Sequence, residues 1–191
     1  MITSKKDLLL YINEDKKQNL GAHNIGWKTY LGEYLYGTDR MKAYQYLKAL
    51  RKYEYALNCL CKKGLLGKLM ILYRHYRLHK LSEKYNVVIG PNMVGYGFRM
   101  PHILGGGIVI NCKSMGCYCS ANVNVLIGNN KSCNDRPEIG DNVKFTTGSK
   151  AYGNITIGSQ VIVAPNSVVV KDIPDNCVVS GIPAKIIKKK S

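Results

Sequence analysis

The chain has 191 residues, 46% of them hydrophobic, and its 28 Lys and Arg against 12 Asp and Glu give a net charge of +16. This length and hydrophobicity argue against a disordered chain, and no apolar run approaches the roughly 20 residues that span a bilayer. The opening stretch MITSKKDLLLYINEDKK is too briefly apolar for a secretory signal. We therefore expect a cytoplasmic globular protein.

The basic residues are spread through the first 84 residues and recur in the tail KIIKKK, without a recognisable DNA- or RNA-binding motif. We therefore expect no nucleic-acid partner, and a basic surface that attracts anionic ligands instead. The seven cysteines are an odd number, which favours reduced thiols over a disulfide framework. Neither Cys59-x-Cys61 nor Cys117-x-Cys119 has the spacing of a zinc motif, and we expect no metal.

Helical spacing dominates the chain up to Tyr85. The segment 38–60, TDRMKAYQYLKALRKYEYALNCL, offers Thr38 or Asp39 as N-cap and repeats apolar residues about one turn apart. The segment 65–85, LLGKLMILYRHYRLHKLSEKY, predicts a second helix. His75 and His79 lie one turn apart on it, but their basic neighbours favour surface residues over metal ligands.

After Tyr85 the helical spacing ends, and apolar residues recur at every sixth position. The positions in this phase, with Cys133 the only one that is not aliphatic or aromatic, are Val109, Met115, Ala121, Ile127, Cys133, Ile139, Phe145, Ala151, Ile157, Val163 and Val169. Small or aliphatic residues also lie two positions before the later members, at Val143, Ser149, Ile155, Val161 and Ser167.

A period of six fits neither a helix nor a simple strand. It fits a triangular coil whose three short faces each send one side chain inward, the parallel β-helix of hexapeptide repeats. Glycine and asparagine, as in IGDN, suit the tight corners. We therefore expect an α+β chain with a helical region at residues 1–85 and a β-helix with a C-terminal tail at residues 86–191.

The stretch PEIGDNVKFTTGSKAYGNITIGSQVIVAPNSVVVKDIPDNCVVSGIPAKII resembles the end of left-handed β-helix acyltransferases, and in particular the serine acetyltransferase family and its relatives in bacterial surface-polysaccharide clusters. The order of parts adds to the likeness: FRMPHILGGG, the strand IVIN, the excursion GNNKSCNDRPEIG, uninterrupted hexads and SGIPAK. The resemblance covers about residues 86–191 and implies a left-handed coil, with the helical region capping its wide end.

His102 matches the family's catalytic histidine, set between Pro101 and three glycines. The resemblance implies that it is the general base that removes the acceptor's hydroxyl proton, for which a neutral imidazole is suited near pH 7. The group that orients the ring stays open between a backbone carbonyl at 105–107 and the carboxamide of Asn122, which could equally be a corner residue of the coil.

The resemblance also implies that acetyl-CoA is the co-substrate. Its expected binding residues are Asn129, Asn130, Lys131, Gly148, Ser149, Ala164, Pro165 and Lys185, with Lys188 as an alternative phosphate contact. Relatives pack three coils side by side, which implies a homotrimer with the cleft of His102 between subunits.

Three departures from the serine enzymes affect the expected acceptor. Val88 and Pro101 stand where those enzymes have aspartates, and Pro137 stands where a second histidine follows the Asp-Arg pair. These losses favour an uncharged acceptor, a sugar hydroxyl of a capsular or other exopolysaccharide. The alternatives are serine acetylation for cysteine synthesis and a non-catalytic scaffold whose basic helices contact an anionic membrane or glycolipid.

Overall fold

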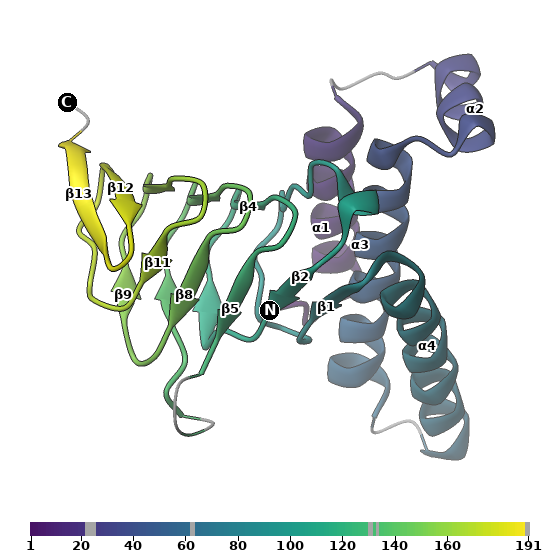
Figure 1. The fold of residues 1–191 in the computed structure, drawn as a ribbon. Coiled ribbons are helices and arrows are strands. Elements are labelled where there is room, and N and C mark those ends of the chain that lie inside the picture. Colours follow the sequence, from purple (N-terminus) through teal and green to yellow (C-terminus); the bar gives the residue numbers. More distant parts are fainter. Residues whose placement is uncertain (22–25, 62–63, 130–131, 133, 190–191) are drawn as a thin grey trace.

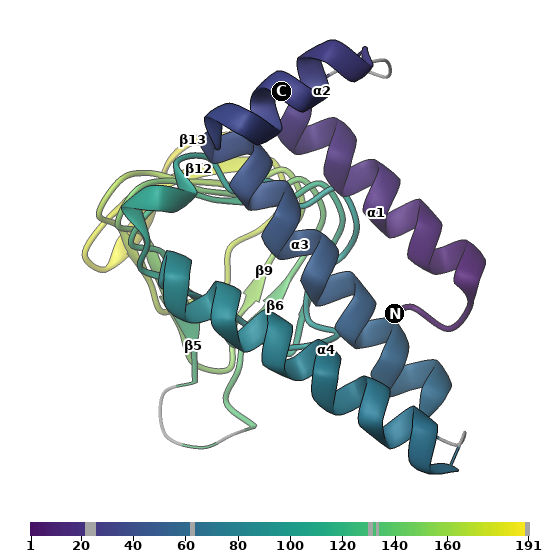
Figure 2. The same ribbon diagram turned by 90° about the vertical axis from the view of Figure 1, so that its right-hand side faces the viewer.

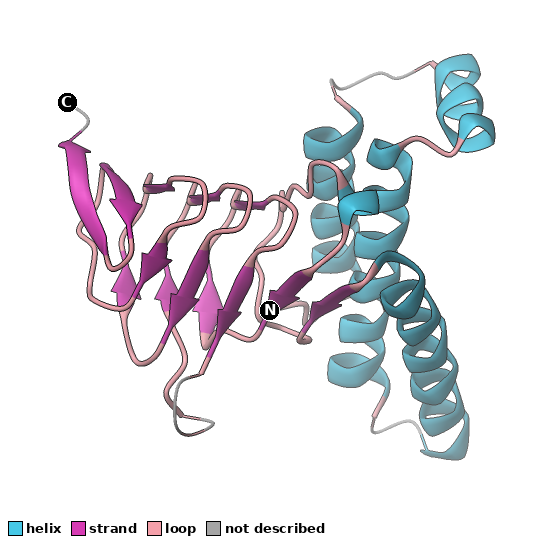
Figure 3. Cartoon of the chain, viewed as in Figure 1, coloured by secondary structure: helices cyan, strands magenta, loops and turns pink. Residues whose placement is uncertain are grey.

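The structure is a computed structural model that describes residues 1–21, 26–61, 64–129, 132 and 134–189. A group of helices is followed by a coil of short strands (Figures 1 and 3). The helices are α1 (Lys5–Leu20), α2 (Trp27–Tyr36), α3 (Asp39–Tyr55) and α4 (Gly64–Tyr85), with a π-helical turn, Ala56–Leu60, after α3 and a 3₁₀ turn, Ile103–Gly105, inside the coil region.

Helix α3 forms where the sequence predicts it. The Thr38 hydroxyl accepts a hydrogen bond from the N–H of Met41 at 3.3 Å, which satisfies one of the free donors of the first turn. Met41, Leu47 and Leu50 are fully buried, so the apolar face of this helix enters the core.

Helix α4 is confirmed, but its apolar side chains do not all face the core. Leu65, Leu66 and Leu69 in its first half are exposed, whereas Leu78 and Tyr85 near its end are buried. Both histidines of α4 are exposed, and His79 Nε2 lies 3.2 Å from a carboxylate oxygen of Glu83, a neighbour that the sequence analysis overlooked.

The strands form three sheets, one for each face of a triangular coil (Figures 1 and 3). The first sheet holds β1 (Val87–Ile89), β2 (Ile108–Ile110), β5 (Leu126–Gly128), β8 (Lys150–Tyr152) and β11 (Val168–Val169). The second holds β4 (Ser120–Ala121), β7 (Lys144–Phe145), β10 (Ile162–Val163), β12 (Cys177–Gly181) and β13 (Ala184–Lys189). The third holds β3 (Ser114–Met115), β6 (Glu138–Ile139) and β9 (Thr156–Ile157).

Each turn of the coil stacks on the next through parallel strand pairs. Val163 pairs with Phe145, and these residues are 18 positions apart, three hexads to a turn. Phe145 pairs with Ala121, which is 24 positions away because the excursion after β5 adds one hexad to that turn. Only the hairpin of β12 and β13, which ends the coil, is antiparallel among the described strands.

The hexad positions face the interior as predicted, with one exception. Every described member of the phase from Met115 to Val169 is buried, as are all five positions of the second column, while Cys133 lies outside the described residues. The prediction is wrong for the first member, Val109, which is only half-buried, whereas Ile108 and Ile110 on either side of it are buried. Ile110 stacks on Ile127, so the step from Ile110 to Met115 is one residue shorter than a hexad.

The helices cover the end of the coil where it begins (Figure 2). Leu47 and Leu50 of α3 belong to the same buried cluster as Val87 and Ile108 of the first two strands, so one continuous core runs from the helices into the coil. The division at residue 85 stays a prediction. None of the described helices is long and apolar enough to cross a membrane.

A buried ion network joins the helices to the first coil turn. The Nε of Arg51 lies 2.8 Å from Asp15 of α1, and its Nη1 lies 3.1 Å from Glu54 of α3. Its guanidinium also donates to the carbonyls of Val94 and Gly95 at 2.8 and 2.7 Å. Burial lowers the pKa of Arg51, but the two carboxylates outweigh it and raise the pKa above its usual range, so the side chain stays charged.

Replacing Arg51 therefore leaves two buried carboxylates without their counter-ion. We expect Arg51→Met to lower the free energy of unfolding by about 3–5 kcal/mol, as measured by urea denaturation. Lys17→Met, which removes a cation that pairs with Glu14 at the surface, is the control and changes this energy by less than about 1 kcal/mol. Equal effects of the two substitutions would contradict the importance of the buried network.

Burial also makes the thiols of two coil cysteines unreactive. Desolvation raises the pKa of Cys112 and that of Cys119 to about 12, so neither thiol ionises near pH 8. We expect iodoacetamide at pH 8 to alkylate the exposed Cys61 and to spare both buried thiols until the protein is denatured, with modification mapped by mass spectrometry. Alkylation of Cys112 or Cys119 in the folded protein at the rate of Cys61 would contradict this.

Candidate functional site

His102 stands on irregular backbone at the surface of the coil. Its φ and ψ are 58° and 41°, a left-handed conformation that is uncommon for a residue with a side chain. The turn is fixed by two hydrogen bonds, from the Gly105 N–H to the His102 carbonyl at 2.9 Å and from the Gly106 N–H to the Ile103 carbonyl at 3.0 Å. The side chain is 75% exposed, so this backbone presents the imidazole to solvent.

The glycines after His102 begin a column of corners along one edge of the coil. The N–H of Asn124 donates to the carbonyl of Gly106 at 3.0 Å, and the N–H of Gly148 donates to the carbonyl of Val123 at 2.9 Å. One turn further, the N–H of Asn166 donates to the carbonyl of Thr147 at 3.0 Å. The edge that starts beside His102 therefore continues past Gly148 to Pro165.

Gly148 is required by this stacking. Its φ is +71°, and a Cβ at this position would lie 2.1 Å from Oδ1 of Asn166 in the next turn. A side chain would be strained in this left-handed conformation and would have to displace the carboxamide of Asn166.

Asn122 lies at one of these corners. Its Oδ1 accepts a hydrogen bond from the N–H of Val123 at 2.9 Å, which is the behaviour of a corner residue. The hydrogen bonds of the described residues include none between Asn122 and His102. The catalytic role of Asn122 stays a prediction, and its carboxamide already has a structural one.

The residues expected to bind coenzyme A are only partly gathered on this edge. Ala164 is half-buried and Pro165 is exposed beside Asn166. Lys185 is exposed on β13 and pairs with Ser180, next to Gly181, whose N–H donates to Ser167 of the last corner at 3.1 Å. Two small residues thus lie on this edge, and Lys185 places an exposed cation on the hairpin that follows the last corner.

The other expected contacts lie elsewhere or are already engaged. Ser149 is buried, and both its N–H and its hydroxyl donate to the carbonyl of Thr146, at 3.1 and 2.7 Å. Asn129 is exposed at the start of the excursion, at the next edge of the coil. Asn130 and Lys131 lie outside the described residues. All these assignments to coenzyme A stay predictions.

The carboxylate that faces His102 comes from the helical region. Oδ2 of Asp39, in the first turn of α3, lies 3.7 Å from Nδ1 of His102, an ion-pair distance rather than a hydrogen bond. Oδ1 of the same carboxylate is buried and has no hydrogen-bond partner among the described residues. The carboxylate therefore lies on the Nδ1 side of the imidazole.

A cavity of about 540 Å³ opens beside this pair, between the helices and the coil. Its lining brings together two carboxylates, Glu33 and Asp39, and two guanidiniums, Arg40 and Arg99. The full lining is Asn19, Glu33, Thr38, Asp39, Arg40, Arg99, Met100, Pro101 and His102. Among the described residues neither guanidinium has an ion-pair partner, so the cavity can offer charges of both signs to a ligand.

Sequence reasoning found His102 but missed the four charged groups around it. It looked for them in the coil, where Val88 and Pro101 carry no charge. Three of them come from α2 and α3 instead, and Arg99 lies in the first coil turn, where it bridges to Ser120. The residues 39 and 102 are separated by 63 positions, and no local pattern links them. Across the described residues, no group of three or more His, Cys, Asp and Glu side chains could hold a metal ion.

Comparison with known proteins finds serine acetyltransferases by both sequence and fold. The chain is 30% identical over 164 residues to serine acetyltransferase from Buchnera aphidicola subsp. Schizaphis graminum, covering 82% of this chain and 55% of that protein. It is 40% identical over 94 residues to the Staphylococcus epidermidis enzyme, covering 45% of this chain and 42% of the relative. The chain thus spans about half the length of these relatives. No protein-family model matches it.

Solved structures of the same group share the fold. Neisseria gonorrhoeae serine acetyltransferase in complex with serine is 26% identical, has a TM-score of 0.69 and is covered over 69% of its length by 95% of this chain. The Brucella abortus strain S19 enzyme in complex with coenzyme A is 21% identical, has a TM-score of 0.71 and is covered over 70% of its length by 98% of this chain. The expected α+β class, a helical region followed by a left-handed parallel β-helix, is confirmed. In sequence and in fold, the chain is similar to serine acetyltransferases.

Proposed function

We propose that the protein is an acetyl-CoA-dependent O-acetyltransferase that uses His102 as general base and L-serine as acceptor. One observation carries the proposal: the exposed imidazole of His102 faces a cavity that holds two carboxylates and two guanidiniums. The homology to serine acetyltransferases supports the same reaction.

In this reaction His102 removes the proton of the acceptor hydroxyl as its oxygen attacks the thioester carbonyl. The new C–O bond forms, the C–S bond breaks, and the imidazolium returns the proton to the departing thiolate. Asp39, 3.7 Å from Nδ1, stabilises the transient positive charge on the ring. Transfer is direct in a ternary complex in this proposal, and the buried thiols of Cys112 and Cys119, whose pKa is raised to about 12, are poor nucleophiles for a covalent alternative.

The charges of the cavity favour a zwitterionic acceptor. The carboxylates of Glu33 and Asp39 can pair with the ammonium group of the acceptor. The planar guanidiniums of Arg40 and Arg99 can each donate two hydrogen bonds to its carboxylate. The sequence argument against serine rested on the lack of such groups, and the helical region supplies three of them, Glu33, Asp39 and Arg40. We therefore place serine before the sugar hydroxyl of the sequence analysis.

A saccharide remains the second candidate acceptor, for one specific reason. The coil of this chain has lost three polar groups of the serine enzymes, at Val88, Pro101 and Pro137, and Val88 is exposed. An uncharged acceptor would not need those groups. Its acetylation would then belong to capsular or exopolysaccharide assembly.

We propose that acetyl-CoA lies along the edge of the coil that begins beside His102. Ala164 and Pro165 leave room for the pantetheine arm, and Lys185 or Lys188 meets the phosphates as an exposed cation. We also propose a homotrimer in which this edge faces the neighbouring coil, as the resemblance implies.

The acceptor is decided by release of free thiol from acetyl-CoA, measured with L-serine, sugars, nucleotide sugars and oligosaccharides. We expect turnover with L-serine, weak or no turnover with ethanolamine and glycerate, which each lack one of its charges, and none with saccharides. His102→Ala should lower kcat by about 10²- to 10⁴-fold while the melting temperature stays unchanged. Turnover with a saccharide alone would replace serine by the second candidate, and full activity of the variant would remove His102 from the mechanism.

A second prediction concerns Asp39 as the group that positions His102. Asp39→Asn removes the charge at Nδ1 and should lower kcat for serine roughly 10- to 100-fold, with an unchanged KM for acetyl-CoA. Steady-state kinetics with each substrate varied in turn measures both constants.

Glu33→Gln is the matched control, because Glu33 lines the same cavity but forms no ion pair with His102. It should raise the KM for serine and leave kcat nearly unchanged. If both variants changed only KM, Asp39 would bind the acceptor without positioning the base.

A further inference from the structure

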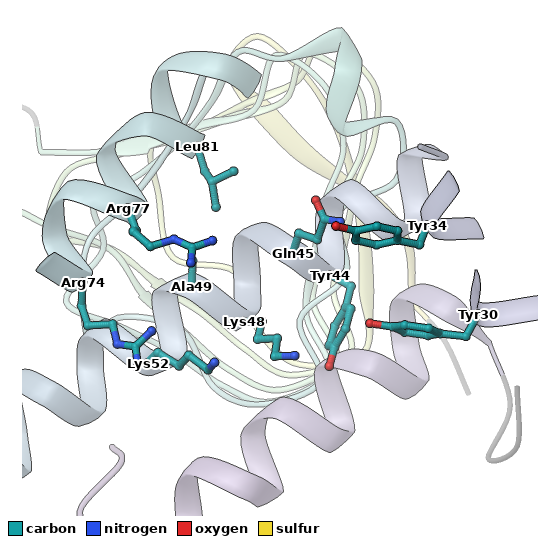
Figure 4. A pocket seen from close by; sticks show the side chains of 10 residues that line it. All are labelled: Tyr30, Tyr34, Tyr44, Gln45, Lys48, Ala49, Lys52, Arg74, Arg77 and Leu81. Carbon is teal, nitrogen blue, oxygen red and sulfur yellow. The ribbon is translucent and has the colours of Figure 1, made fainter. Parts of the chain in front are cut away.

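A second cavity, of about 370 Å³, lies between α2, α3 and α4, and shares no lining residue with the cavity of His102. Figure 4 shows the side chains that line it. They are Tyr30, Tyr34, Tyr44, Gln45, Lys48, Ala49, Lys52, Arg74, Arg77 and Leu81. We call it the basic cavity.

Four cations and no carboxylate line the basic cavity. Lys48 and Lys52 lie one turn apart on α3, and Arg74 and Arg77 lie three residues apart on α4, so two helices direct like charges to one place. Within the described part of the chain none of the four forms an ion pair with a carboxylate. Their charge is left uncompensated.

The cations are held there despite a cost. Lys48, Lys52 and Arg74 are half-buried. Burial lowers the pKa of Lys52, and the positive charges of Lys48, Arg74 and Arg77 lower it further. A cluster that repels itself in the free protein is a site where a bound anion relieves repulsion.

Aromatic residues contact three of the four cations. Arg77 donates to the Tyr73 hydroxyl at 3.4 Å, and the guanidinium of Arg74 lies 5.5 Å from the centre of the same ring. The ammonium of Lys48 lies 5.6 Å from the ring centre of Tyr44. These contacts favour positions of the three cations around the cavity.

Tyrosine hydroxyls add neutral donors to the other wall. Those of Tyr30 and Tyr34 point toward the side on which the cations lie (Figure 4). Burial raises the pKa of Tyr44 to about 12, so this hydroxyl also keeps its proton at neutral pH. Guanidinium forks and hydroxyl donors together match the oxygens of a phosphoryl group, and the tyrosine rings leave an apolar wall for what is attached to it.

We propose that the basic cavity binds a phosphorylated ligand, with Lys48, Lys52, Arg74 and Arg77 around the phosphoryl oxygens and the tyrosines of α2 and α3 against the attached group. Nothing in the acetyl-transfer proposal uses these residues, so this site stands independently of that reaction. The phosphoryl group could belong to a soluble metabolite or to a lipid headgroup, and both present the same chemistry.

The test is binding of inorganic diphosphate to the full chain without acetyl-CoA or acceptor, by isothermal titration calorimetry. We expect saturable binding and a raised melting temperature, since a ligand of the folded state stabilises it. The double variant Lys52→Gln/Arg74→Gln should weaken binding at least tenfold. Lys5→Gln/Lys171→Gln removes the same charge from exposed positions elsewhere and should bind as the wild type does.

Equal weakening in both double variants would show a general attraction to the basic surface and overturn the site, and so would the absence of diphosphate binding to the wild type. If the first double variant does not fold, Arg77→Gln, which alters an exposed side chain, replaces it and should lose the same diphosphate affinity.

Sedimentation with phosphatidylglycerol vesicles, compared with phosphatidylcholine vesicles, distinguishes a lipid headgroup from a soluble ligand. Co-sedimentation lost in the cavity variant assigns a lipid headgroup, and diphosphate binding without co-sedimentation assigns a soluble ligand.

Discussion

The buried guanidinium of Arg51 is the constraint on which the proposed acceptor site depends. This cation is shielded from solvent. It forms ion pairs with Asp15 and Glu54 of the helices and donates hydrogen bonds to two carbonyls of the first coil turn. The carboxylates in turn accept from the coil: the Phe98 N–H donates to Asp15 at 3.0 Å, and the Asn92 N–H donates to Glu54 at 2.8 Å. Such a network tolerates one relative placement of helices and coil, because any other leaves a buried charge unpaired.

That placement decides what lies opposite His102. The coil alone offers an exposed imidazole on a left-handed turn, with uncharged neighbours at Val88 and Pro101. The docked helices add the carboxylate of Asp39 at Nδ1 and the charges of Glu33 and Arg40. The proposed chemistry is therefore shared between the two regions. Helix α2 lies between two cavities, since Glu33 lines the one beside His102 and its neighbour Tyr34 lines the basic cavity.

The sequence predicts the coil well because its physical signal is local and repeated. A corner every six residues demands a small or apolar inward side chain each time, and ten of the eleven positions in the phase carry an aliphatic or aromatic residue, which is visible without any long-range information. It failed at Val109, where one step is a residue short and a count by six cannot notice it. It also predicted the Thr38 cap, since capping depends on residues three positions apart.

The charged surroundings of His102 could not be predicted in the same way. Asp39 meets His102 only because helix α3 crosses the end of the coil, and that crossing is set by the packing of Leu47 and Leu50 and by Arg51 rather than by any motif. The exposure of the leucines in the first half of α4 could not be predicted either. In a helix rich in apolar residues, the sequence pattern does not indicate which face packs against the core.

The most direct measurement of the central claim is a crystal structure with L-serine and coenzyme A bound. The account predicts the serine hydroxyl at Nε2 of His102, its ammonium against Glu33 or Asp39, and its carboxylate against Arg40 or Arg99. Serine bound away from the helices, or contacting only residues of the coil, would contradict the claim that the helical region builds the acceptor site.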